Sequence, residues 1–469
     1  MRRPVSIRAT IFTALLLAAA LTFPAAASAG KYAALGSYTG ASLFAAQPDG
    51  KLLLRGSTKD CSELEECVGR PFIARIRRSG ELDTGFGAGN GIARIPIHGS
   101  RVGITAASLQ ANGKIVVVGA SGRDEHATWF VVRLRPNGNP DRSFGSSGRV
   151  RLPSSIGYVS SASLAIDSNR RIIVVGSRYP GLVVAALLPS GRPDESFGDG
   201  GVLTGDFDSD AIYEEPEGLA ILDDDRILIS GTSETGFPGY GYYIGLAQFL
   251  ANGSPDPSFG GGDGRAIGPG IRGQTGEDPG HDRSGGMPIV SANGITIVGH
   301  AGQSGWHQCP SGLITRFDRE GNWDPSYGSS GVRLFRCVSG FRGVTAADGS
   351  LLVSGSADYY DLTFPRVGRF NPDGSADVAF NRSTGPRGLR PAGLQGYGTG
   401  VVEVGGSSFF SASMMLDPCK AYARPKPDCQ VATVTKLKKD GSLDRSFGTA
   451  GVTSFPPLKL CRRNPLQPC

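Results

Sequence analysis

The chain has 469 residues, with 70 glycines, 31 prolines and only four methionines, and its formal net charge is +6 at pH 7. This composition indicates many turns, and no long segment after the N-terminal region has the 3.6-residue apolar period of an amphipathic helix. Basic and acidic residues are interspersed, which argues against a basic patch for nucleic acid.

Residues 1–29 have the pattern of a secretory signal peptide. Three arginines precede an apolar run at residues 11–23, and small residues follow at 27–29. Cleavage after Ala29 would leave Gly30 as the first residue; an uncleaved signal anchor is the alternative. The apolar run is shorter than the roughly 20 residues that span a bilayer. The sequence therefore predicts a secreted or cell-surface protein with no membrane span after the signal.

One short phrase, an Asp followed three residues later by an aromatic residue, recurs seven times, and in six of the copies the next residue is Gly. The aromatic residues are about 60 residues apart on average. The Asp and aromatic residues of the seven copies are Asp83 and Phe86, Asp141 and Phe144, Asp194 and Phe197, Asp256 and Phe259, Asp324 and Tyr327, Asp377 and Phe380, and Asp444 and Phe447. A regular period of this length indicates a single repeat domain, although chain length alone would suggest two or three domains.

Two strand-like runs precede each phrase. The nearer run is Phe72–Arg77 in the first copy and Phe130–Arg135 in the second. The earlier run is short, ends in Gly and is rich in leucine or β-branched residues. We assign it to Leu52–Gly56, Ile115–Gly119, Ile172–Gly176, Ile227–Gly231, Ile295–Gly299, Leu351–Gly355 and Val401–Gly405. Most of these runs follow an Asp-Gly or Asn-Gly pair, which favours a two-residue hairpin turn.

A further strand before that turn, such as Gly103–Leu109, and one after the phrase, such as Gly148–Leu152, complete four strands per repeat. Four-stranded repeats arranged in a ring form a β-propeller. We therefore predict an all-β fold, a seven-bladed β-propeller with four strands per blade; another β-solenoid or a sandwich is the alternative. The predicted domains are the signal peptide at 1–29, the propeller at 30–457 and a C-terminal tail at 458–469. Residues 31–38 are a candidate for closing the ring by pairing with the last blade.

The repeated pattern, a DG turn, a hydrophobic run ending in G-S, a second strand and a DG-x-x-D-x-S-F-G phrase, resembles the delta-60 repeat family of exported bacterial proteins. The resemblance covers about residues 40–457. It implies a repeat fold and little established biochemistry. This sequence departs from the pattern at Tyr327 in the fifth copy and at Ala379 and Asn381 in the sixth.

A cation stands eight residues before the phrase Asp in five of the seven repeats. These cations are Arg75, Arg133, Arg316, Arg369 and Lys436, whereas the third and fourth copies have Ala186 and Gln248. A fixed offset in most blades favours a structural clip between strand and loop over a ring of charges for a ligand. We expect the aromatic residue to pack between blades rather than to stack on carbohydrate, and the following Gly to need a positive φ.

The eight cysteines form four pairs whose members are close together in the sequence. The pairs are Cys61 with Cys67, Cys309 with Cys337, Cys419 with Cys429, and Cys461 with Cys469. Local disulfides are the natural interpretation in an exported chain, although eight cysteines allow 105 pairings. A metal site is the alternative, but none of the pairs has CxxC spacing.

One acidic segment resembles a calcium loop. Asp206, Asp208, Asp210 and Glu217 stand at positions 1, 3, 5 and 12 of such a loop. Position 6 is Ala211, where the turn of a calcium loop needs Gly, and the alternative is a solvated acidic loop. Calcium is the one cofactor that the sequence suggests.

No motif for catalysis is apparent, because the five histidines are scattered and no nucleophile elbow is present. The leading hypothesis is a non-catalytic binding or scaffold module for an extracellular glycan or protein, with recognition on insertions near Phe237–Tyr243, Gly273–Gly285 and Asp417–Gln430. A hydrolase or lyase with its active site in the central channel is one alternative, which an inward-facing cluster of acids, His and Arg would favour. A structural component of the cell envelope is the other alternative. No nucleic-acid partner is expected, and the oligomeric state is left open.

Overall fold

The structure, a computed structural model, describes residues 37–60, 68–97, 102–122, 127–153, 162–236, 241–270, 284–301, 311–328, 330–359, 362–380, 389–391, 396–406, 408–416, 430–448 and 451–455. These residues form 28 β-strands and no helix. Accordingly, this part of the chain contains no helix long and apolar enough to cross a membrane.

The strands form seven antiparallel sheets of four, each built from one continuous stretch of chain. Blade 1 contains β1 (Ser37–Ala46), β2 (Leu52–Asp60), β3 (Val68–Ile76) and β4 (Ile92–Arg94). Blade 2 contains β5 (Gly103–Leu109), β6 (Ile115–Ser121), β7 (Thr128–Leu134) and β8 (Arg149–Arg151). Blade 3 contains β9 (Ala162–Ile166), β10 (Ile172–Arg178), β11 (Gly181–Leu187) and β12 (Val202–Gly205). Blade 4 contains β13 (Ala211–Ile221), β14 (Ile227–Thr235), β15 (Gly241–Phe249) and β16 (Arg265–Gly270).

The last three blades repeat this order. Blade 5 contains β17 (Ser284–Ser291), β18 (Gly294–Ala301), β19 (Ser311–Phe317) and β20 (Val332–Arg336). Blade 6 contains β21 (Val338–Thr345), β22 (Leu351–Tyr359), β23 (Leu362–Phe370) and β24 (Arg390–Pro391). Blade 7 contains β25 (Gly396–Val404), β26 (Ser408–Leu416), β27 (Gln430–Lys438) and β28 (Val452–Phe455). The predicted seven-bladed, all-β propeller is confirmed.

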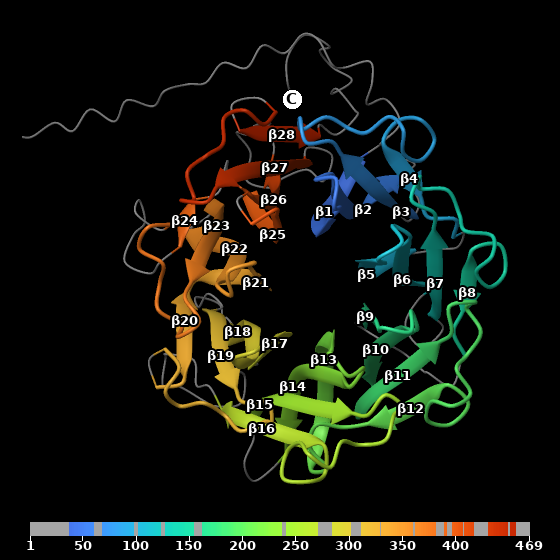
Figure 1. The fold of residues 1–469 in the computed structure, drawn as a ribbon, viewed down its shortest axis with the longest axis vertical. Helices are drawn as coiled ribbons and strands as arrows, with labels where there is room; N and C mark the ends of the chain where they lie inside the picture. The colour runs from blue at the N-terminus through green and yellow to red at the C-terminus, as the bar shows by residue number, and fades with distance from the viewer. Residues whose placement is uncertain are drawn as a thin grey trace, which may run out of the picture.

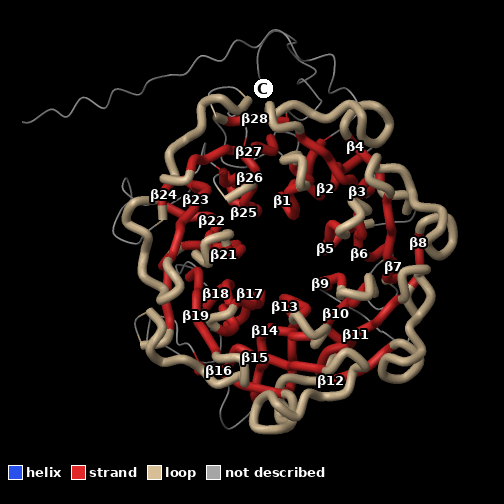
Figure 2. Tube along the Cα trace, viewed as in Figure 1, coloured by secondary structure: helices blue, strands red, loops and turns tan. Residues whose placement is uncertain are grey.

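The blades stand side by side around one central axis, with the first strand of each blade innermost (Figure 1). Loops and turns, drawn in tan, connect the strands around the ring (Figure 2). Because each blade is an antiparallel meander, the connections between strands 1 and 2 and between strands 3 and 4 lie on one face, which we call the phrase face. The connections between strands 2 and 3, and from strand 4 to the next blade, lie on the opposite face, which we call the linker face.

A hydrophobic core lies at every interface between blades. Second strands such as β2 read as continuous apolar runs because both faces of each sheet are buried: Leu52 and Leu54 pack toward blade 7, and Leu53 packs toward blade 2. Each of the seven interface cores contains one phrase aromatic, and none of these aromatics is more than 2% exposed. The aromatic side chains are therefore unavailable for stacking on carbohydrate.

The ring closes by the same backbone contact that joins blade 1 to 2, 2 to 3, 3 to 4 and 4 to 5, and not by strand exchange. The backbone N–H of Gly448 in blade 7 donates to the carbonyl oxygen of Ser79 in blade 1 at 3.0 Å, as Gly87 donates to Asn137 at 2.7 Å between blades 1 and 2. The suggestion that residues 31–38 pair with the last blade is wrong at its described end, because Tyr38 pairs with Thr58 inside blade 1. Residues 31–36 lie outside the described part.

Two strand predictions need correction. The seventh earlier run, Val401–Gly405, is the end of the innermost strand β25 and not the second strand, which is β26. Gly405 and Gly406 have φ values of 62° and 67° and turn the chain between these strands. The Asp-Gly pairs do place Gly at positive φ, as at Gly50 with φ 77°, but β1 and β2 are joined by residues 47–51 and not by two residues.

Candidate functional site

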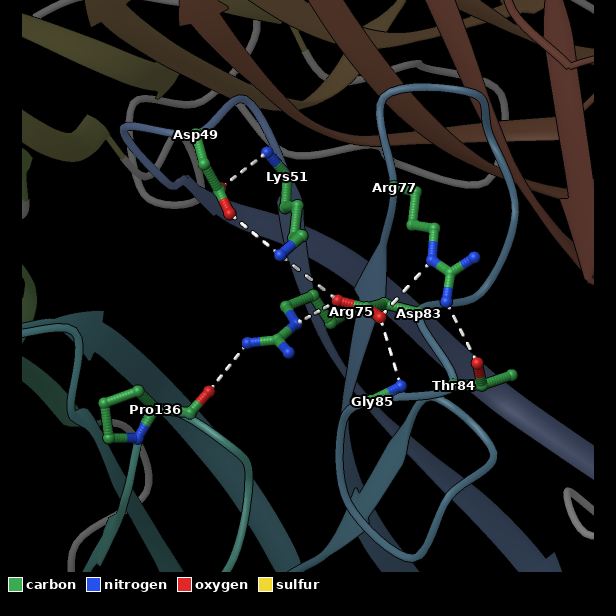
Figure 3. A network of polar contacts seen from close by, with 8 residues as sticks. All are labelled: Asp49, Lys51, Arg75, Arg77, Asp83, Thr84, Gly85 and Pro136. Carbon is green, nitrogen blue, oxygen red and sulfur yellow. Dashed lines mark hydrogen bonds and ion pairs between the residues drawn. The ribbon is translucent and has the colours of Figure 1, made fainter.

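The repeated cation and the phrase Asp form a clip inside each blade. Nε of Arg75 donates to Oδ2 of Asp83 at 2.9 Å (Figure 3), and Nε of Arg133 donates to Oδ2 of Asp141 at 2.8 Å. The same pairing recurs for Arg316 and Asp324 at 2.8 Å, for Lys436 and Asp444 at 2.8 Å, and for Arg369 and Asp377 at 3.4 Å. These charges are therefore paired within the fold, which is what a structural clip requires.

The clip also holds the next blade. Nη1 of Arg75 donates to the carbonyl oxygen of Pro136 in blade 2 at 2.6 Å, and Arg133 donates in the same way to Pro189 in blade 3. Each of these guanidinium groups lies 4.5 Å from the ring centre of its phrase aromatic, a cation–π geometry. One side chain thus joins a strand, a loop and the neighbouring blade.

The third and fourth blades obtain their cation from a different strand. Arg171 and Arg226, which immediately precede the second strands β10 and β14, donate from Nη1 to Asp194 and Asp256 at 2.9 Å. Gln248, which replaces the usual cation in blade 4, still donates to Asp256 at 2.7 Å. Sequence reasoning missed this second source of charge, although Lys51 and Lys114 occupy the same position in blades 1 and 2.

The pKa of the phrase Asp is lowered in the clips of blades 1 to 4. Burial alone would raise the pKa of Asp83, but the backbone N–H of Gly85 and the cations of Arg75, Arg77 and Lys51 outweigh burial and lower it below the usual value. The pKa values of Asp141, Asp194 and Asp256 are lowered by the same kind of balance. The clips are therefore ionised at neutral pH.

The four predicted calcium ligands are not brought together. Asp206 pairs with Nη1 of Arg265 at 2.8 Å, and Oδ1 of Asp208 accepts the backbone N–H of Asp210 at 3.0 Å. Glu217 lies farther along β13, on a bulge that directs it toward blade 5. In the part of the chain that the structure describes, no three His, Cys, Asp or Glu side chains are grouped to hold a metal ion. The geometry gives the calcium hypothesis no support.

Glu214, which the sequence did not single out, organises this acidic turn. Its side chain is 1% exposed, and Oε1 accepts the backbone N–H groups of Phe207 and Asp208 at 2.7 and 2.9 Å. Burial, together with the charges of Asp206 and Asp208, raises the pKa of Glu214 to about 7 against these two hydrogen bonds. The carboxyl group therefore changes its protonation near neutral pH.

A polar cluster lies between blades 4 and 5 toward the channel. Oε1 of Glu217 accepts the hydroxyl of Thr232 at 3.0 Å, and Oε2 lies 3.6 Å from Nδ1 of His300. Gly285 on the innermost strand leaves room for this carboxyl, because a Cβ at Gly285 would overlap Oε1. Burial raises the pKa of Glu217, while the charges of His300 and Arg342 and the hydrogen bond from Thr232 oppose the rise. The cluster combines an acid, a histidine and an arginine from three blades.

Blade 5 has a hollow on the phrase face, with a volume of about 250 Å³. It is lined by Asn293, Arg316, Phe317, Asp318, Asn322, Trp323, Asp324 and Pro325. Trp323 stands where blade 1 has Leu82, and its Nε1 donates to the hydroxyl of Thr315 at 3.1 Å. Of the other tryptophans, Trp129 is buried between blades 2 and 3 and Trp306 lies outside the described residues.

Comparison with known proteins supports a repeat β-propeller. Four segments match the family model described as "Domain of unknown function (DUF5122) beta-propeller", at residues 47–86, 110–144, 222–259 and 346–380. Each segment ends at a phrase aromatic, in blades 1, 2, 4 and 6. These matches are consistent with a family of repeat β-propellers. No curated protein matches the chain.

Solved structures with a similar arrangement include a protein of unknown function from Dyadobacter fermentans, with 11% identity, TM-score 0.41, and coverage of 67% of this chain and 91% of the other. The β-propeller domain of the Trilobed protease from Pyrococcus furiosus has 8% identity, TM-score 0.41, and coverage of 86% and 94%. The α-L-arabinanase from Cellvibrio cellulosa has 12% identity, TM-score 0.35, and coverage of 61% and 95%. Likenesses of this size do not bear on function.

Only one of the eight cysteines lies in the described residues. Cys337, between β20 and β21, is disulfide-bonded. Its predicted partner Cys309 and the other predicted pairs lie outside the described part, as do most residues of the three predicted insertions. Asn381, the one residue that replaces a phrase Gly, also lies outside it, whereas the phrase glycines, such as Gly87 with φ 66°, have the expected positive φ.

Proposed function

We propose that this chain is a secreted, non-catalytic binding protein of the delta-60 repeat type, which recognises an extracellular glycan or protein on the linker face. In this proposal residues 1–29 are removed on export, residues 30–457 form the propeller, and residues 458–469 form a tail with a local disulfide. Detection of Gly30 as the N-terminal residue of the exported protein tests the first part; retention of residues 1–29 would overturn it.

The observation that carries the proposal is the position of the insertions. Residues 236–240 join β14 to β15, residues 271–283 join β16 to β17, and residues 417–429 join β26 to β27. All of the strand ends that flank these segments lie on the linker face. Variable segments on one face of a rigid frame are the usual arrangement of a recognition surface, and the charges of the repeated clips are used within the blades.

The test combines binding screens with two loop exchanges in the full exported chain. In the first variant an Asn-Gly turn replaces residues 417–429, because Leu416 and Gln430 already pair across the hairpin. In the second, residues 271–283 are shortened to five residues, the length that joins β12 to β13. We expect binding on a glycan array or an extracellular-protein array that at least one exchange abolishes, with unchanged melting. No binding in either screen, or binding that both variants retain, would overturn the proposal.

A second candidate, a hydrolase or lyase in the channel, is favoured by the cluster of Glu217, His300 and Arg342. A partly buried carboxyl group with a raised pKa beside a histidine is a pattern found at general acid–base sites. Polysaccharide cleavage that Glu217→Gln abolishes without a change in melting would replace the binding function by this one. Cleavage that persists in Glu217→Gln, or absence of cleavage, would remove the candidate.

A further inference from the structure

Blades 1 and 5 can be aligned residue by residue at their clips, because their strands pair in the same register. Leu52 pairs with Ile76 in blade 1, as Ile295 pairs with Phe317 in blade 5. The bridge from Ile76 to Leu82 likewise corresponds to the bridge from Phe317 to Trp323. It follows that Gly294 occupies the position of Lys51, Asp318 that of Arg77, and Asp324 that of Asp83.

In blade 1 three cations surround Asp83 (Figure 3). Oδ2 of Asp83 lies 2.9 Å from Nε of Arg75 and 3.5 Å from Nζ of Lys51, and Oδ1 lies 3.3 Å from Nε of Arg77. The position of Lys51 is also cationic in blades 2, 3 and 4, where Lys114, Arg171 and Arg226 contact the phrase Asp. Four consecutive blades therefore place a basic side chain at this point on the phrase face.

Blade 5 lacks two of these three cations. Arg316 remains and holds Asp324 through Nε at 2.8 Å and Nη2 at 2.5 Å. Gly294 has no side chain to replace Lys51, and at φ 115° a Cβ there would overlap the carbonyl oxygen of Phe317. The third position carries a carboxylate, Asp318, in place of a guanidinium group. The hollow of about 250 Å³ lies at this place.

The lining of the hollow has the charge and surface of a cation site. Among the residues that line the hollow, Asp318 and Asp324 each carry a negative charge and Arg316 carries a positive one, so the three groups sum to one negative charge. The Asp324 side chain is 22% exposed, compared with 7%, 4%, 8% and 3% for the phrase Asp of blades 1 to 4 and 19% for that of blades 6 and 7. Trp323 adds an aromatic ring to the lining, and an indole face attracts cations more strongly than other aromatic rings.

We propose that the blade-5 hollow binds an ammonium or guanidinium group supplied by another molecule, which takes the place that the chain's own Lys51 and Arg77 side chains fill in blade 1. The group belongs either to a free amine or to a lysine or arginine side chain of a protein partner. This site lies on the phrase face and is separate from the linker-face recognition proposed above.

The experiment uses fluorine NMR of the full exported chain labelled with 5-fluorotryptophan. The protein has three tryptophans, and Trp323→Leu, which introduces the residue that blade 1 has there, assigns the Trp323 signal. Methylguanidinium chloride and methylammonium chloride are titrated as cationic probes, and sodium acetate as an anionic one. We expect a saturable shift of the Trp323 signal with the cations and none with acetate.

Two substitutions of Asp318 sharpen the test. Asp318→Asn removes one charge and should weaken cation binding about tenfold. Asp318→Arg introduces the residue that blade 1 has at this position, and should abolish the saturable shift while the melting temperature is retained. Glu320→Gln is the matched control, because Glu320 is an exposed acid on the same loop but not in the lining, and it should leave the affinity unchanged within about twofold.

The outcomes separate the possibilities. Absence of a saturable shift with both cations, a shift with acetate, or a shift that persists in Asp318→Arg would overturn the proposal. Tighter binding of an arginine-containing peptide than of methylguanidinium would identify a protein side chain as the ligand, whereas equal affinity would identify a free amine. The two loop-exchange variants of the linker face should bind the cations normally, so failure of one proposal is distinguishable from failure of the other.

Discussion

Arg171 donates from Nη1 to Oδ2 of Asp194 at 2.9 Å, and it does so from the entry to the second strand rather than from the third strand. In blades 1 and 2 the third strand supplies the main cation and the second-strand entry adds a lysine. In blade 3 the third strand has Ala186, and the second-strand entry carries an arginine that also binds Asp167 at 2.5 Å. Two positions in the repeat can therefore supply a cation to the phrase Asp. Where one position lacks a cation, the other provides it.

This exchange predicts a rescue. Arg171→Met should lower the free energy of unfolding by about 3 kcal/mol, because it leaves a buried carboxylate without its cation. Adding Ala186→Arg should restore part of that loss, since blades 1 and 2 accommodate an arginine at this position. Guanidinium unfolding measures both variants. Arg178→Met, at the exposed end of β10, is the control; a loss no larger than that of the control would show that the clip does not stabilise blade 3.

The phrase glycines should not tolerate a side chain. Gly87→Ala should destabilise the protein by about 3 kcal/mol or more, because φ is 66° and a Cβ would overlap the carbonyl oxygen of Ile92. Gly89→Ala, at φ 89° with nothing within 4 Å of the added Cβ, should cost about 1 kcal/mol. Thermal unfolding of both variants checks the difference. If both variants lose the same stability, the positive φ alone explains why residue 87 is a glycine, and the overlap with Ile92 does not contribute.

Glu214 should make the protein less stable as the pH rises. Its pKa of about 7 in the fold exceeds the ordinary 4.5, so the folded state binds the proton more tightly and stability declines from about pH 4.5 through pH 7. The shift corresponds to about 3 kcal/mol. Glu214→Gln should flatten this decline, which melting temperatures between pH 4 and 9 would measure. The exposed Glu195→Gln is the control; a profile for Glu214→Gln parallel to the wild-type one would contradict the expectation.

The clips should fail in acid. Because the pKa of Asp141 is lowered in the fold, its contribution is present above the ordinary value near 3.8 and is lost as the pH falls through the lowered value. Unfolding measured between pH 6 and 2 at low salt should therefore steepen below about pH 4. Asp141→Asn should be less stable at pH 7 and less sensitive to acid. If its acid profile matches that of the exposed control Asp199→Asn, the pairing of Arg133 and Asp141 is not the source.

The sequence predicted the blades well because the information is local and repeated. An Asp and an aromatic residue at one spacing identify every interface, and Arg75 at a fixed offset from Asp83 identifies the clip. Prediction was wrong where the period was broken: Gly405 resembles the end of a second strand but forms a turn. Arg171 was missed because its partner, Asp194, is 23 residues away in sequence.

The candidate sites could not be predicted, because they depend on distances between blades. Glu217 and His300 are 83 residues apart in sequence, and a strand bulge directs the carboxyl to the histidine. The blade-5 hollow lies where Gly294 and Asp318 replace the cationic side chains of Lys51 and Arg77 in blade 1. Such a difference becomes visible only when the strand registers of two blades are compared.

The contact between Gly448 and Ser79 makes the interface that closes the ring similar to the other interfaces between blades. Since the joint between the last and first blades uses the same kind of hydrogen bond as the joints among blades 1 to 5, and a hydrophobic core as at every interface, the position of the chain ends within the circle is arbitrary. A circular permutant that starts at blade 3 and links blade 7 to blade 1 covalently should keep every interface. Gain or loss of whole blades would therefore need no new kind of closing contact. Only the angle between neighbouring blades around the ring would change.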